Sequence, residues 1–300
     1  MMNRWWLLLL LILSWLAAGF VLSRSFNTPH FNNSAADNSV NRIVSTAPNL
    51  TEILFALGLD EKITAVSSDS DYPPETAKKQ KTGTFWQPNI EAIIAAKPDL
   101  VLTLAFQQQA DIAHRLNRMG YKTISVNIET VGDLFDAIET IGTAVGCNAA
   151  AKGLVSGIKE RLHNVSNELS VMEKVKVLYV VQRQPLRVAG TDTFINELIE
   201  YAGGQNAIGK TIHKYPPIGA ETVYASGAEV IIEPTMGQKD PGQQQQSAIR
   251  YWQKFAALPA VKNNRIYVID GDVVARLGPR ICLAVETIAH CLQPQLFENR

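Results

Sequence analysis

The sequence has little of what a disulfide-stabilised scaffold needs. Only three cysteines occur in 300 residues. Cys282 and Cys291 fall on one predicted helix, about 13 Å apart along its axis, whereas a disulfide requires Cα atoms within about 7 Å. Cys147 is remote from both in the sequence. We therefore expect three buried thiols.

An excess of charge of either sign is also absent. Lysine and arginine together number 28, as do aspartate and glutamate, so the formal net charge is zero. Nucleic-acid-binding proteins usually carry a basic patch and a high pI. We therefore expect no nucleic-acid partner.

The common catalytic and metal-binding motifs are missing as well. The sequence contains no H-E-x-x-H, C-x-x-C or G-x-S-x-G. Its five histidines do not cluster at the spacing of metal ligands. We predict no catalytic residues, no metal site and no cofactor, and hence a protein that is not an enzyme.

One segment does match a catalytic motif letter for letter. Residues 204–211 read G-x-x-x-x-G-K-T, the phosphate-binding loop of many nucleotide-binding enzymes. That loop requires a strand before it and a helix after it. Here a predicted helix, Thr193–Ala202, precedes the segment, and Pro216-Pro217 follows it. We interpret the segment as the glycine turn that ends a helix.

The N-terminus carries a long apolar run. Arg4 precedes residues 5–22, which are almost all apolar. The run suits either a cleaved secretory signal or an uncleaved anchor, because its length lies near the minimum of about 17–25 residues for a membrane-spanning helix. Residues 23–41, rich in Asn, Ser and Ala, are expected to form a disordered tether. In both cases the protein is exported.

The rest of the chain alternates between strand and helix patterns. This alternation predicts parallel βαβ units in two α/β lobes, residues 42–147 and 173–300. Between them lies the longest helical pattern, Asn148–Met172, which we expect to join the lobes as a rigid backbone helix. Loops are expected at residues 182–190 and 238–246.

An internal repeat supports two similar lobes. In the first copy, Asn89 precedes Glu91 at a helix start, and Asp99 opens a strand. In the second, about 130 residues later, Gly219 precedes Glu221, and an acidic residue again opens a strand. Glu91 and Glu221 could simply complement helix dipoles. Their matching placement instead favours docking onto arginines of a symmetric partner.

Aromatic residues gather in the predicted loops. In open α/β sheets, ligands bind beyond the carboxyl ends of the strands, so facing loops of two lobes would form an aromatic-lined cleft. The rings could alternatively fill the cores of their own lobes. The residues concerned are Tyr72, Phe85, Trp86, Phe106 and Tyr215.

Several segments together match a known pattern. They are Ile43–Asn49, Asp71-Tyr72-Pro73-Pro74, Trp86-Gln87 with Asn89-Ile90-Glu91, Lys97–Val101, Ala202–Asn206 and Gly278–Ile281. These segments, between about Arg42 and Leu296, resemble the substrate-binding proteins of ABC importers for cobalamin, haem and iron-siderophores, most closely the vitamin B12-binding proteins. The resemblance implies two Rossmann-like lobes joined by a helix.

The resemblance also implies functional residues. It places Trp86, Tyr215, Asp272 and Arg276 around a corrinoid and gives Glu91 and Glu221 the role of docking to the permease. The chain departs from the pattern at Tyr215, where a tryptophan can stand, and at Ala202, where a cysteine can pair with one in the last helix. Leu186 and Arg187 stand where an aromatic residue might stack. The predicted ligand-binding residues are Tyr72, Trp86, Phe106, Leu186, Arg187, Tyr215, Asp272 and Arg276.

The resulting prediction is a monomeric periplasmic protein that binds cobalamin and delivers it to an ABC permease and its ATPase. One alternative is a haem or iron-siderophore binder. In that case Arg183, Arg187 and Arg276 would suit an anionic chelate, and Tyr72 or Tyr215 could ligate haem iron. A second alternative is an exported α/β enzyme that uses the same cleft, with Asp272 near Arg276 as its titratable pair.

Overall fold

A computed structural model describes residues 40–235, 237 and 240–296. The predicted signal or anchor and most of the predicted tether lie outside these residues. Within the described part of the chain, no helix combines the length and the apolar character that a membrane span requires.

The N-terminal lobe is built on a parallel sheet with strand order β3-β2-β1-β4-β5. Strands β1 and β4 at its centre are almost wholly buried, as is typical of a parallel sheet covered on both faces. The strands are β1 (Ile43–Ser45), β2 (Ile63–Val66), β3 (Gln80–Lys81), β4 (Leu100–Leu104) and β5 (Thr123–Val126). The helices are α2 (Pro48–Ala56), α3 (Ile90–Ala95), α4 (Gln107–Arg118) and α5 (Val131–Ala144).

The C-terminal lobe repeats the plan with one addition. Strand β6 lies between β9 and β8, both parallel to it, and β10 extends the sheet beyond β9. The far end of β6 forms an antiparallel hairpin with β7. The strands are β6 (Val175–Arg183), β7 (Leu186–Val188), β8 (Gly204–Asn206), β9 (Val230–Pro234) and β10 (Ile266–Ile269). The helices are α7 (Phe194–Tyr201), α8 (Ala220–Ser226), α9 (Pro241–Trp252), α10 (Pro259–Lys262), α11 (Gly271–Val274) and α12 (Ile281–Leu292).

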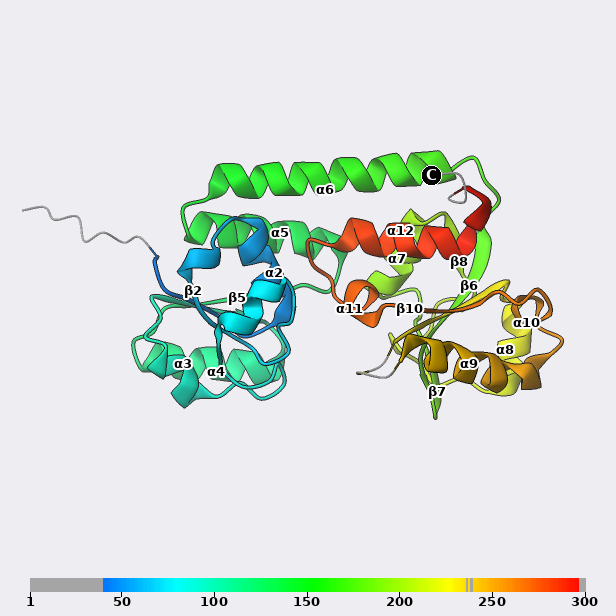
Figure 1. Ribbon diagram of the computed structural model, residues 1–300, viewed down its shortest axis with the longest axis horizontal. Coiled ribbons are helices and arrows are strands. Elements are labelled where there is room, and N and C mark those ends of the chain that lie inside the picture. The colour runs from blue at the N-terminus through cyan, green and yellow to red at the C-terminus, as the bar shows by residue number, and fades with distance from the viewer. Residues whose placement is uncertain (1–39, 236, 238–239, 297–300) are drawn as a thin grey trace, which may run out of the picture. The chain divides into compact units, whose positions relative to one another are not determined.

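Helix α6 (Asn148–Leu169) connects the two lobes, as predicted, although it ends before Met172. It contacts α5 of the N-terminal lobe and α7 and α12 of the C-terminal lobe (Figure 1). Its buried face is a helical stripe that includes Val155, Ile158 and Leu162. One apolar cluster runs from the N-terminal sheet through these helices to the C-terminal sheet. The connection is therefore a packed core rather than a flexible linker.

The predicted repeat is present in three dimensions. The backbone N–H of Asp99 donates to the carbonyl of Arg42 at 2.8 Å, and the Asp99 carboxylate accepts from the Arg42 N–H at 2.9 Å. Glu229 makes the same pair of hydrogen bonds with Lys176, at 2.9 and 2.8 Å. In each lobe an acidic residue thus fixes the start of the central strand.

Side-chain caps explain where several helices begin. The Asn89 side chain accepts from the N–H of Ala92, as predicted for an N-cap. Thr130 forms a capping box with Asp133 at the start of α5. The Thr193 side chain accepts from the N–H of Asn196 at the start of α7, and the Asp240 side chain accepts from the N–H of Gln243 at the start of α9.

Three local predictions were wrong. Residues 182–188 of the predicted loop 182–190 belong to the β6–β7 hairpin, because Val180 and Val188 pair across it. The glutamine-rich segment is helical from Pro241 onward, because Asp240 caps it and Pro241 suits the first helical position. Residues 204–206, interpreted as part of a turn, form β8.

The cysteines largely agree with expectation. All three are free, and Cys282 and Cys291 are buried, although Cys147 is only half-buried. Burial raises the pKa of Cys291 to about 12.

Candidate functional site

A cleft of about 530 Å³ lies between the two lobes. It sits at the carboxyl ends of β1 and β4, where the chain order of the N-terminal sheet reverses, which is the usual ligand position in open α/β sheets. The N-terminal lobe contributes Pro48, Asn49, Asp69, Thr84, Phe85, Trp86, Leu104 and Ile128. The C-terminal lobe contributes Phe194, Ala275, Arg276 and Leu277.

Three aromatic rings pack together at this cleft. The centroid of Phe85 lies 4.8 Å from that of Trp86 and 5.1 Å from that of Phe106, and Trp86 and Phe106 are 5.5 Å apart. Phe85 also packs against the core of the lobe. Trp86 remains 63% exposed. A large indole supported from behind and open in front is suited to stacking on a flat ligand.

The loop that carries Trp86 is held tightly at its base. Gly83 has φ +88°, and a Cβ there would lie 2.6 Å from the carbonyl oxygen of Gln87. Only glycine therefore fits this turn. The N–H of Phe85 donates to the carboxylate of Asp69, and the N–H of Asn89 donates to the carbonyl of Thr82 at 2.7 Å.

Gln109 supports the same loop from below. This fully buried side chain accepts from the Thr46 hydroxyl at 2.6 Å and from the Leu104 N–H at 2.8 Å. Its amide nitrogen donates to the carbonyls of Thr46 at 3.1 Å and Phe85 at 2.9 Å. Gln109 thereby ties the ends of β1 and β4 to the aromatic loop. The sequence analysis missed it, although a glutamine run directly after a buried strand was an available signal.

Arg276 lies on the C-terminal side of the cleft and pairs with two carboxylates. It forms an ion pair with Asp71 of the N-terminal lobe and one of 3.0 Å with Asp272 of its own lobe. Burial would raise the pKa of Asp71, but the hydrogen bond and charge of Arg276 outweigh it and hold that pKa below its usual value. Burial raises the pKa of Asp272, and repulsion from Asp71 adds to this shift.

A second interlobe ion pair lies next to the first. Arg280 donates to both carboxylate oxygens of Glu52, at 2.9 and 2.6 Å, and to the carbonyl of Asp272 at 3.1 Å. Its guanidinium also lies 4.0 Å from the ring centroid of Tyr72. Tyr72, predicted to bind ligand, is 44% exposed and is thus held in place by a cation on its face.

The remaining predicted ligand residues are not part of the cleft lining. Tyr215 is half-buried and packs against the core. The Arg187 guanidinium donates to the carbonyl of Tyr215 at 3.1 Å. Leu186 is buried in a separate apolar cluster of the C-terminal lobe. Trp86 and Arg276 line the cleft directly, and Phe106 and Asp272 contact them.

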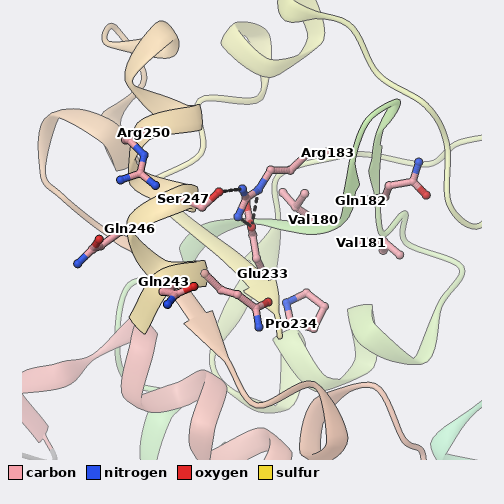
Figure 2. Close-up of a pocket in the computed structure, with 11 residues that line it drawn as sticks. Val180, Val181, Gln182, Arg183, Glu233, Pro234, Gln243, Gln246, Ser247 and Arg250 are labelled. Atoms are coloured by element: carbon pink, nitrogen blue, oxygen red, sulfur yellow. Dashed lines mark hydrogen bonds and ion pairs between the residues drawn. The ribbon is translucent and has the colours of Figure 1, made fainter. Parts of the chain in front are cut away.

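Arg183 lies in a different, polar cavity of about 590 Å³ at the ends of β6 and β9. Figure 2 shows its guanidinium directed at Glu233, which it contacts at 2.6 Å, and at the Ser247 hydroxyl, 2.9 Å away. Glu233 is 5% exposed and also accepts from the indole N–H of Trp252 at 2.6 Å. The charge of Arg183 is therefore neutralised within the lobe.

The two glutamates predicted to dock a permease occupy matching positions. Glu91 lies in the first turn of α3 and Glu221 in the first turn of α8. Both side chains are exposed. Their docking role stays a prediction. Within the described ranges, no group of three or more His, Cys, Asp or Glu residues could hold a metal ion.

Comparisons with known proteins agree with this architecture. Residues 43–273 match the periplasmic binding protein family. The chain is 31% identical over 265 residues to an uncharacterised ABC transporter substrate-binding lipoprotein of Bacillus subtilis, covering 86% of this chain and 82% of that protein. It is 28% identical over 250 residues to a vitamin B12-binding protein of Vibrio parahaemolyticus, and the match covers 83% of this chain and 88% of that protein.

A solved structure shows the same fold. It comes from Staphylococcus epidermidis and is described as a possible iron-binding, periplasmic solute-binding protein. Its TM-score to this chain is 0.75 at 29% identity, covering 85% of this chain and 99% of that one. The chain therefore belongs to the periplasmic binding protein family, as an ABC-type substrate-binding protein. The predicted family and the predicted two-lobed fold are confirmed.

Proposed function

We propose that this protein captures a corrinoid such as cobalamin in the interlobe cleft and delivers it to an ABC permease. The observation that carries the proposal is the exposed face of Trp86, backed by Phe85 and Phe106 and directed to the cleft. A flat macrocycle gains about 0.5–1.5 kcal/mol per aromatic contact beyond the area it buries. The similarity to a vitamin B12-binding protein supports the same ligand class.

The charges around the cleft favour a neutral macrocycle over an anionic one. Haem carries propionates and a ferric catecholate carries negative charge, so each gains from an unpaired arginine. Here Arg276 is paired with Asp71 and Asp272, and Arg280 with Glu52. Arg183, considered for an anionic chelate, is paired with Glu233. A corrinoid with peripheral amides needs hydrogen bonds rather than a free cation.

Binding and delivery require no covalent chemistry. The family consists of solute-binding proteins, and an ABC importer implies a permease and an ATPase as partners. The continuous core through α6 restricts how far the lobes can separate, so we expect the ligand to enter with small movements of the loops. An N-terminal anchor would keep the protein close to the permease.

Titration calorimetry tests the ligand. The full-length protein is titrated with cyanocobalamin, haemin and a ferric catecholate. We expect a saturable heat with cyanocobalamin and a loss of affinity of at least about 3- to 10-fold in Trp86→Ala, which removes one aromatic contact together with the area it buries. Tyr224→Ala is the matched control, because Tyr224 is also an exposed ring but does not line the cleft. Absence of heat with cyanocobalamin would exclude a corrinoid.

A haem or iron-siderophore ligand is the second candidate. The likeness to a possible iron-binding protein supports it, as does the exposed Tyr72, whose hydroxyl could ligate haem iron. Tighter binding of haemin than of cyanocobalamin, lost in Tyr72→Phe, would establish this alternative.

A further inference from the structure

Arg276 forms ion pairs with two carboxylates, one from each lobe. Asp272, four residues away on the same lobe, already forms an ion pair with it at 3.0 Å. Asp71 reaches Arg276 from the other lobe, and its second oxygen lies 3.2 Å from a guanidinium nitrogen. Arg276 is largely covered, with 18% of its side chain exposed, whereas 55% of the Asp71 side chain is exposed. The exposed Asp71 carboxylate therefore pairs with the largely covered Arg276 guanidinium, which lines the cleft.

Other charged groups surround the pair formed by Asp71 and Arg276. Lys81 is close enough to interact with Asp71, but its ammonium donates to the carbonyls of Ser70 at 2.9 Å and Thr76 at 3.2 Å. Arg280 is engaged by Glu52. Asp69, which also lines the cleft, adds a further carboxylate. This end of the cleft thus has negatively charged Glu52, Asp69, Asp71 and Asp272 around positively charged Lys81, Arg276 and Arg280.

We propose that Asp71 is a specificity-determining residue that occupies Arg276 in place of a ligand carboxylate and so makes the cleft select against anionic ligands. The proposal deepens the function proposed above and rests on it. An anionic ligand must displace Asp71 from Arg276 or bind beside the exposed Asp71 carboxylate. A neutral macrocycle meets neither obstacle. The selectivity arises from repulsion of the wrong ligand as well as attraction of the right one.

The test replaces Asp71 by asparagine, which has the same shape but no charge. Haemin, with two propionates, serves as the anionic probe and cyanocobalamin as the neutral probe, each titrated into full-length protein. In Asp71→Asn we expect the ratio of haemin affinity to cyanocobalamin affinity to rise at least tenfold. The gain should disappear in the double variant Asp71→Asn/Arg276→Gln, because the released guanidinium is then absent.

A matched control separates this effect from a general change in net charge. Glu286 on α12 forms an ion pair with Arg161 on α6, and neither residue lines the cleft. The substitution Glu286→Gln removes the carboxylate of this pair. It should leave the ratio of haemin affinity to cyanocobalamin affinity within threefold of the parent's ratio. A rise in Glu286→Gln equal to that in Asp71→Asn would overturn the proposal, as would an unchanged ratio in Asp71→Asn.

Two outcomes separate a failure of this inference from a failure of the proposed corrinoid function. If the parent protein binds no cyanocobalamin, the corrinoid proposal fails. Haemin affinity is then compared between the parent and Asp71→Asn, and a tenfold gain in the variant supports the role of Asp71. Conversely, tight cyanocobalamin binding by the parent with no gain for haemin in Asp71→Asn supports the corrinoid and refutes the selective role.

Discussion

Arg280 reaches across the lobe boundary to a carboxylate that is almost fully buried. Its two hydrogen bonds to Glu52 measure 2.9 and 2.6 Å, and only 3% of the Glu52 side chain is exposed. Glu52 lies on α2, whose first residues, Pro48 and Asn49, line the cleft, and Arg280 directly precedes α12. This bidentate pair fixes the two lobes at the base of the site.

Removing the carboxylate should destabilise the protein strongly. In Glu52→Ala we expect the free energy of unfolding to fall by about 3–5 kcal/mol, because a guanidinium is left buried without its partner. Chemical denaturation followed by circular dichroism measures this. Glu286→Ala breaks a pair in which Arg161 is 61% exposed, so it should cost about 0–1 kcal/mol. Similar losses in both variants would show that Glu52 has no special structural role.

Gln109 should control the position of Trp86. Gln109→Leu leaves the Phe85 carbonyl and the Leu104 N–H without their partner, at a cost of about 1–3 kcal/mol for each unsatisfied group. We expect the loop to loosen, which would shift the Trp86 resonance in ¹⁹F NMR of protein labelled with 5-fluorotryptophan. The resonance is assigned with Trp86→Phe.

Gln108→Leu is the matched control, since Gln108 is the exposed neighbour of Gln109 on α4. It should leave the Trp86 resonance in place. A Gln109→Leu variant that lowers thermal stability but does not move this resonance would contradict a positioning role and leave only a structural one.

Glu197 is expected to make stability depend on pH in an unusual direction. Its carboxylate accepts from the N–H of Val131, in the other lobe, at 2.8 Å. Burial raises its pKa above 4.5, and the charges of Asp133 and Glu200 add to this shift. The folded state therefore binds the Glu197 proton more tightly than the unfolded state. The resulting stability is present below the unfolded pKa and is lost as pH rises through the folded pKa.

Glu197→Gln keeps an oxygen acceptor and removes the charge. We expect it to raise the melting temperature relative to the parent at pH 7.5, and this advantage to vanish near pH 4. Thermal unfolding at the two pH values checks the prediction. Glu139→Gln, an exposed carboxylate on α5, should show no such difference. A lower melting temperature for Glu197→Gln at pH 7.5 would indicate that the ionised carboxylate is needed by Val131.

Much of the fold could be predicted because periodicity and capping act locally. Asn89 caps α3, and the buried runs of β2 and β4 fall where alternation of strands and helices places them. The prediction failed where a distant partner decides the local structure. Residues 204–206 become a strand because β6 pairs with them, and Leu186 lies in a hairpin because Arg183 pairs with it.

The site could be predicted only in part, for the same reason. The exposed Trp86 was predicted from its place in the loop that leads into a predicted helix, and Arg276 and Asp272 came from the family resemblance. The roles of Glu52 and Gln109 depend on partners far along the chain: Arg280 for the first, and Thr46 and Phe85 for the second. No local pattern encodes such pairs, and the packing of the half-buried Tyr215 against the core likewise depends on tertiary structure.

Glu91 and Glu221 provide the last test, which concerns delivery rather than capture. Each lies exposed in the first turn of its helix, at equivalent points of the two repeats. If they only complement helix dipoles, each substitution should lower stability by about 0.3–1 kcal/mol and affect nothing else. If they meet arginines of a permease, the double variant Glu91→Ala/Glu221→Ala should bind ligand normally but fail to support uptake.

The measurement is uptake of labelled cyanocobalamin by cells that carry the permease, alongside calorimetry of the isolated protein. Glu139→Ala/Glu160→Ala removes two exposed carboxylates from α5 and α6 and controls for the change in net charge. We expect uptake to fall at least tenfold in the first double variant and to stay within twofold in the second, with equal ligand affinity in both. Because affinity is measured separately, unchanged uptake in Glu91→Ala/Glu221→Ala would assign these carboxylates to helix stabilisation alone.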